Sequence, residues 1–92
     1  MESSKVIVTV IGEDKVGIIA AVSSTLAENQ INILDITQTI MQGFFTMIMV
    51  VDISKGKIGI MELQDVLEEL GRRIGMRIQA QHEDIFRYMH RI

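Results

Sequence analysis

The period of the hydrophobic pattern changes repeatedly along this chain, and the order of the changes restricts the fold more than any other feature. A β-branched run at residues 5–11 is typical of a strand. Residues 16–29 then repeat apolar side chains at helical spacing. Two further strand patterns, 31–41 and 44–53, flank the turn-forming pair Gln42 and Gly43. This half of the chain therefore predicts a strand, a helix and a β-hairpin.

The second half repeats a helix and a strand. An apolar stripe at spacings of three and four predicts a helix that ends between Gly71 and Gly75. Residues 76–81 alternate apolar and polar side chains, as a half-buried strand does. Residues 85–92 have the pattern of a short amphipathic C-terminal helix. The apolar stripe of the longer helix, which ends before Gly75, consists of Leu63, Val66, Leu67, Leu70 and Ile74.

The resulting order, βαββαβ, predicts an α+β fold of the ferredoxin-like sandwich type. Right-handed crossovers place both main helices on one face of a four-stranded antiparallel sheet. With 92 residues, the chain is expected to form one domain over positions 1–92. The second face of the sheet stays open, and it presents Phe44, Ile48 and Val50 together with one side of the first strand. We therefore expect a homo-oligomer, dimer or higher, that covers this face.

Composition excludes several classes of function. The net charge is -3, whereas a nucleic-acid-binding domain normally carries a basic stripe, so no direct nucleic-acid binding is expected. The chain has no cysteine, which excludes zinc–thiolate sites and thiol redox chemistry. The longest apolar stretch, 44–51, is too short to span a bilayer, and the chain begins without the pattern of a secretory signal. These features predict a cytoplasmic protein with no membrane contact.

The loop between the first strand and the first helix is the one segment whose residues suggest a site. Gly12 permits a sharp turn, and Asp14 is expected to cap the helix, which leaves the amides of Lys15, Val16 and Gly17 in its first turn. Unpaired amides at a helix start suit a carboxylate. Asp14 would accept a hydrogen bond from an ammonium group, and Asn32 is expected nearby. The same residues are also explained by turn chemistry and a helix cap alone.

Two segments of the sequence carry a family resemblance. Residues 12–23 (Gly-Glu-Asp-Lys-Val-Gly-Ile-Ile-Ala-Ala-Val-Ser) and 32–38 (Asn-Ile-Leu-Asp-Ile-Thr-Gln) resemble an ACT domain. Within that family, the chain is most similar to the small stand-alone proteins related to the glycine-cleavage transcriptional repressor. The resemblance implies a regulatory domain that binds an amino acid near the first loop, at a subunit interface. It also implies a separate regulated protein. The implied ligand-binding residues are Gly12, Asp14, Lys15, Val16, Gly17, Ile18, Asn32 and Ile33.

Other functions receive less support from the residues. His82 and His90 lack a third metal ligand nearby in sequence, so we expect no metal, no cofactor and no catalytic residue. A small acylphosphate or phosphate-ester hydrolase would need an arginine in the first loop, where only Lys15 stands. An RNA-binding domain would need more exposed aromatic residues than Phe44 and a basic face. The main alternative to a metabolite sensor is a protein–protein interaction module that binds no ligand.

Overall fold

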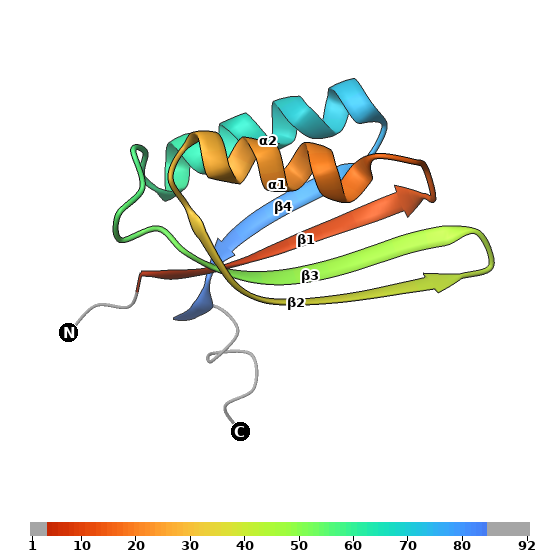
Figure 1. Cartoon of the computed structure of the whole chain (residues 1–92), viewed down its shortest axis with the longest axis horizontal. Coiled ribbons are helices and arrows are strands. Elements are labelled where there is room, and N and C mark those ends of the chain that lie inside the picture. Colours follow the sequence, from red (N-terminus) through yellow and green to blue (C-terminus); the bar gives the residue numbers. More distant parts are fainter. Residues whose placement is uncertain (1–3, 85–92) are drawn as a thin grey trace.

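The computed structural model describes residues 4–84 and shows the expected two-layer sandwich (Figure 1). Its elements follow the order βαββαβ, and the four strands form one antiparallel sheet in the order β2-β3-β1-β4. Both helices cover the same face (Figure 1). The predicted C-terminal helix lies outside the described residues. The elements are β1 (Lys5–Glu13), α1 (Ile18–Glu28), β2 (Asn32–Met41), β3 (Phe44–Asp52), α2 (Ile60–Ile74) and β4 (Arg77–His82).

The core lies between the helices and the two central strands. Alternate residues of β1 and β3 point toward the helix layer and are buried, since neighbouring strand side chains face opposite sides of the sheet. The register pairs Val8 with Met49 and Val10 with Met47 on this face. The phase of β1, which the sequence left open, is therefore settled. The buried set on these strands is Val6, Val8, Val10, Phe45, Met47, Met49 and Val51.

The helices end where the sequence predicted. Asn29 terminates α1, and Gly75 terminates α2 in the left-handed conformation (φ 73°) that glycine adopts without penalty. Along α1 the buried residues are Ile18, Val22 and Leu26, a regular four-residue spacing. Ile19 belongs to the apolar pattern of residues 16–29, yet it is exposed because it lies on the side of α1 that turns away from the sheet's centre.

The second face of the sheet is uncovered in a single copy. Ile11, Phe44 and Ile48 are exposed there, while Ile7 and Val50 are half-buried. Both faces of β1 carry apolar residues, a pattern typical of a central strand covered on two sides. The strand does lie between β3 and β4, but helices cover only one of its two faces (Figure 1).

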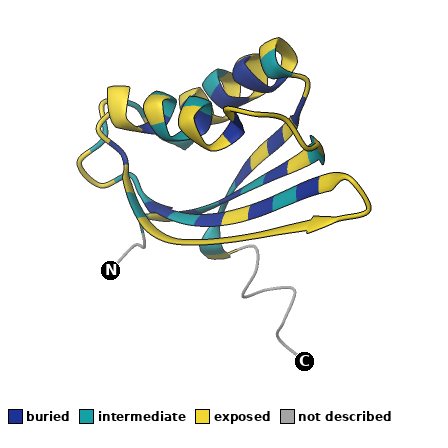
Figure 2. Ribbon diagram, turned by 45° about the vertical axis from the view of Figure 1, so that its right-hand side comes forward, coloured by how far each residue is buried: buried dark blue, intermediate teal, exposed yellow. Residues whose placement is uncertain are grey.

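Strand β2 departs most from expectation. Apolar residues alternate with polar ones along this strand, a pattern that predicts one buried face. Every residue from Leu34 to Met41 is nevertheless exposed (Figure 2). The reason lies in its place at the edge of the sheet, which α1 covers only in part. Ile36 is 43% exposed and Ile40 is 58% exposed, although both point to the helix side. One irregularity, between Ile33 and Asp35, shifts the register near the start of the strand.

Candidate functional site

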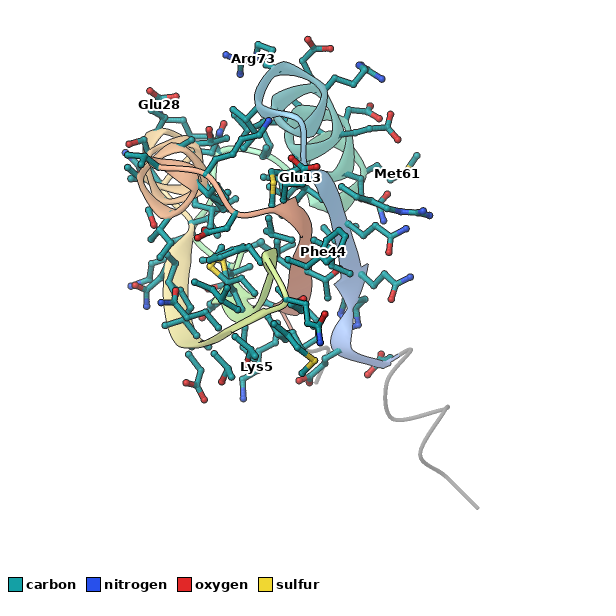
Figure 3. All side chains as sticks on the ribbon, turned by 90° about the vertical axis from the view of Figure 1, so that its right-hand side faces the viewer. Lys5, Glu13, Glu28, Phe44, Met61 and Arg73 are labelled. Atoms are coloured by element: carbon teal, nitrogen blue, oxygen red, sulfur yellow. The ribbon has the colours of Figure 1, made fainter. Side chains whose placement is uncertain are left out.

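The first loop is anchored to the tip of the β2–β3 hairpin. Strand β1 ends at Glu13, which pairs with Phe44 at the start of β3. The next amide, that of Asp14, donates to the carbonyl oxygen of Gly43 at 3.0 Å. Figure 3 looks onto this end of the molecule, where Glu13 and Phe44 come from neighbouring strands. The loop, the hairpin tip and the start of α1 therefore form one corner.

Asp14 does not cap the helix, which corrects the sequence-based prediction. Helix α1 begins at Ile18, its N-cap is Gly17, and no side chain bonds to its first turn. Gly17 has φ 90°, so the chain turns from the loop into the helix in a conformation that a residue with a Cβ adopts only at a cost. The first intrahelical hydrogen bond runs from the Ala21 amide to the Gly17 carbonyl, at 2.9 Å.

This later start moves the unpaired amides by three residues. The first amides of a helix have no partner within it. In α1 these belong to Ile18, Ile19 and Ala20 rather than to Lys15, Val16 and Gly17. They carry the positive end of the helix dipole, which favours an anionic group.

A shallow hollow of about 350 Å³ lies between the start of α1 and the helix-facing side of β2. Four of the predicted ligand residues line it: Asp14, Lys15, Gly17 and Ile18. The other lining residues are Ile19, Ala20, Gln38, Ile40 and Phe45.

Five of these lining residues were not predicted as site residues: Ile19, Ala20, Gln38, Ile40 and Phe45. Gln38 did leave a signal in the sequence, because it is the one polar residue among the even positions 34–40 of β2, where leucine and isoleucine otherwise stand.

The charged groups at the hollow are arranged around an apolar wall. The carboxylate of Asp14 would accept from an ammonium group, and the α1 amides would donate to a carboxylate. Phe45 is buried at the base, and Ile40 is largely exposed at the rim. The Lys15 Nζ donates to the Ile74 carbonyl at 3.2 Å, which ties the loop to the C-terminal end of α2. A small zwitterion with an apolar side chain matches this set of groups.

Two predicted residues of the loop have other roles. Gly12 lies against Met76, and a Cβ added there would come within 2.7 Å of the Met76 Sδ, so a larger residue would require the Met76 side chain to shift. Val16 is fully exposed at the loop tip, where its side chain does not line the hollow. Their contribution to a ligand site is therefore indirect within one copy of the chain.

Asn32 and Ile33 lie at the other end of the sheet, which corrects the expectation that Asn32 faces the loop. Asn32 pairs with Asp52, and Asp52 pairs with Lys5 at the beginning of β1. Nine residues of β1 separate that end from the loop, a distance of about 26 Å at about 3.3 Å per residue. No contact between Asn32 and Asp14 of the same chain is possible in this fold.

Two further hollows follow the opposite edge of the sheet, between α2 and β4. Their volumes are about 320 and 530 Å³, and they share Glu68, Ile78 and Gln79. Two polar side chains there already have partners: the Gln64 side-chain amide donates to the Ala80 carbonyl at 2.8 Å, and Arg72 donates to Glu69 at 2.7 Å. No helix start lines these hollows, in contrast to the corner at α1.

The two acidic side chains whose pKa values are lowered, Asp52 and Glu69, lie away from the corner. The Ser54 amide, which donates to the carboxylate of Asp52, lowers the pKa of Asp52 at the far end of the sheet. The hydrogen bond from Arg72 lowers the pKa of Glu69 on the exposed face of α2. Among residues 4–84, no three potential metal-ligating side chains come together, and no helix is long and apolar enough to cross a membrane.

Comparison with known proteins identifies the family. The family model described as "ACT domain" matches residues 4–81, which is most of the chain. The chain belongs to the ACT domain family. A UPF0237 protein of Methanocaldococcus jannaschii is 55% identical over 89 residues, covering 97% of this chain and 99% of the relative. The resemblance read from the two sequence segments is thereby confirmed. ACT domains are commonly regulatory and ligand-binding.

Solved structures of ACT proteins share the fold. An ACT domain protein from Streptococcus pneumoniae superposes with a TM-score of 0.81 at 40% identity, covering 92% of this chain and 96% of that one. A putative glycine cleavage system transcriptional repressor gives a TM-score of 0.74 at 22% identity, covering 84% of this ACT domain and 44% of that chain. At that lower identity the likeness shows the fold alone.

Proposed function

We propose that this ACT domain is a non-enzymatic regulatory sensor that binds an amino acid in the hollow between the first loop and β2. The observation that carries the proposal is the hollow itself. It joins the unpaired amides of Ile18, Ile19 and Ala20, the carboxylate of Asp14 and an apolar wall. The chain belongs to a family whose members are commonly regulatory and ligand-binding, which supports the proposed sensor function. The regulated target would be a separate protein.

The size of the ligand limits the affinity. The smallest amino acid has about five non-hydrogen atoms, and small ligands reach at most about −1.5 kcal/mol per atom. For a ligand of that size the tightest binding expected is therefore about micromolar. Affinities from micromolar to millimolar suit the sensing of a metabolite pool.

A second copy of the chain would complete the proposed site. Within one copy, the hollow is open on the side of β2, where Ile36 and Ile40 remain exposed. Asn32 and Ile33 keep a role in the proposed site only if they come from a neighbouring subunit, since in one chain they lie at the opposite end of the sheet. The proposed sensor is therefore an oligomer with its ligand near a subunit interface.

Calorimetric titration with each amino acid tests the proposal. We expect one or a few amino acids to bind, and we expect Asp14→Asn to weaken that binding by about tenfold or more, because it removes the charged acceptor for the ammonium group. Asp65→Asn is the matched control, since Asp65 is an exposed acid that lines a hollow between α2 and β4. If Asp14→Asn and Asp65→Asn bind equally well, the ligand is held elsewhere.

The alternative is an interaction module that binds no ligand. The exposed apolar residues at the corner, Val16, Met41 and Phe44, favour this second function. Such a surface suits a protein partner as well as a second subunit. If calorimetric titration with every amino acid gives no heat of binding while the protein remains folded, the interaction module is supported over the sensor.

A further inference from the structure

The open face of the sheet carries a narrow apolar strip. Ile7, Ile11, Ile48 and Val50 point to this face, because their neighbours in sequence on β1 and β3 are buried under the helices. We call these four residues the open strip. Ile11 and Ile48 are each 46% exposed within residues 4–84. Apolar side chains that lie together on one surface indicate a place where another element packs.

Polar residues border the open strip on both sides. On β2, Thr37 faces the same side of the sheet, because it pairs with Ile48. On β4, Gln79 and Gln81 do so, and Gln81 pairs with Ile7. The strip is therefore two strands wide, about 10 Å at a strand spacing of about 4.8 Å. One α-helix with its side chains has a diameter of about 10–12 Å, so a single helix fits this width.

The same borders disfavour a second sheet as the occupant. Two sheets that pack face to face bury side chains from every strand of the two faces. Such a contact would take the polar side chains of β2 and β4 out of water along with the open strip, which costs free energy unless each one finds a partner. A helix covers the two central strands and leaves these polar side chains in water.

The length of the open strip also matches a short helix. Ile11 lies four positions after Ile7 on β1, which is about 13 Å at about 3.3 Å per residue. An α-helix over residues 85–92 would be about 12 Å long, at about 1.5 Å per residue. A helix of that length would therefore reach from one end of the strip to the other.

The sequence of residues 85–92 has the two sides that such a position requires. Ile85, Met89 and Ile92 recur at spacings of four and three, which places them on one side of a helix. Arg87 and Arg91 are one turn apart on the opposite side. The apolar side would lie on the sheet, and the arginines would remain in water.

The described chain ends beside the open strip. Gln81, which pairs with Ile7, lies three positions before Asp84. Glu83 and Asp84 have helical backbone, and the Asp84 amide donates to the His82 Nδ1 at 3.2 Å, as the second amide of a helix donates to an N-cap side chain. The end of the described ribbon lies on the side of the sheet away from the helices (Figures 1 and 2).

We propose that residues 85–92 form a helix that packs on the open strip of the same chain. The segment runs antiparallel to β4, so that Ile85 lies near Ile7 and Ile92 lies near Ile11. The chain's own segment is the occupant because the turn after His82 already lies at the first row of the strip. Strand β1 is then covered on both faces, which its two apolar faces favour.

A spin label on the segment tests this packing in the full chain without any ligand. The chain has no cysteine, so His90→Cys gives a single attachment site for a nitroxide. In the ¹⁵N-labelled protein, we expect the nitroxide to broaden the amide signals of Thr9, Ile48 and Gln79 relative to the reduced label. The signal of Ser24, on the exposed side of α1, should stay sharp. The same spectra verify that the variant is folded.

A mixed sample separates the chain's own segment from that of a second copy. Spin-labelled ¹⁴N protein is combined with ¹⁵N protein that carries no label, so only contacts between copies can broaden a signal. We expect Thr9, Ile48 and Gln79 to stay sharp in this mixture. Broadening of these signals in the mixture would place the segment on a second copy and overturn the proposal. Sharp signals in both samples would overturn it as well.

A matched pair of substitutions tests which side of the segment faces the sheet. In the spin-labelled protein, Met89→Asp puts a carboxylate on the apolar side, so we expect the broadening at Thr9 and Gln79 to be lost. Arg91→Asp introduces the same side chain on the polar side and should leave the broadening in place. Equal broadening in the two variants would contradict the proposed packing. The proposed sensor function plays no part in either measurement.

Discussion

Replacing Gly71 with alanine should lower the free energy of unfolding by about 1–3 kcal/mol. In an exposed helix interior the same change would raise it by up to about 1 kcal/mol. The sign reverses because Gly71 is buried where α2 packs on β4, and an added Cβ would collide with the carbonyl oxygen of Met76. That oxygen belongs to the backbone, so relief requires a shift of the strand. The midpoint of urea unfolding measures the effect.

Gly59 provides the control for this prediction. It is the N-cap of α2, it is exposed, and a Cβ added there meets no atom within 4 Å. Gly59→Ser is expected to leave stability unchanged or to raise it by a few tenths of a kcal/mol, since serine caps helices well. A Gly71→Ala protein as stable as the parent would show that α2 and β4 are packed less closely than described.

Replacing Leu26 with alanine is expected to cost about 2–5 kcal/mol, the range for deleting a buried leucine side chain. Leu26 is fully buried and fixes α1 to the core, so its loss leaves a cavity beneath the helix whose start forms the proposed site. In a chain of 92 residues, this is a large part of the total stability. Thermal unfolding followed by circular dichroism is the appropriate measurement.

Leu34→Ala is the matched substitution on the surface. Leu34 is 46% exposed at the irregularity in β2, so its truncation is expected to cost much less than that of Leu26. Equal losses from the two leucines would contradict the assignment of α1 as a core helix and β2 as an uncovered edge.

Much of the fold could be predicted because it depends on local patterns. The strand and helix periods gave the element order, Gly75 and Asn29 gave the helix ends, and Gln42 and Gly43 gave the hairpin turn. Both turn residues have positive φ, which matches the tight turn that their sequence suggests. These signals act over a few residues and require no knowledge of tertiary contacts.

The remaining features depend on how elements meet in space. The exposure of Ile36 and Ile40 follows from the distance between α1 and the edge strand, which alternation does not encode. Strand β1 continues to Glu13 because it pairs with Phe44, and that extension delays the helix from Asp14 to Gly17. Asn32 was misplaced because β2 begins at the end of the sheet remote from the loop.

The candidate site was predicted in part. Asp14, Lys15, Gly17 and Ile18 are brought together at the hollow, because they follow one another through a single turn. Gln38, Ile40 and Phe45 come from the hairpin, and only the sheet register reveals that they face the same space. The local sequence was therefore sufficient to identify the loop. The residues of the hairpin that face the loop could be identified only from the structure.

In the proposed sensor, the amides at the start of α1 hold the carboxylate of an amino acid. Amide chemical shifts of the ¹⁵N-labelled protein, followed while each amino acid is added to about 10 mM, test it most directly, since this range covers millimolar affinity. We expect at least one amino acid to shift the amides of Ile18, Ile19 and Ala20 together with that of Gln38. Shifts confined to the α2–β4 edge, or none with any amino acid, would contradict it.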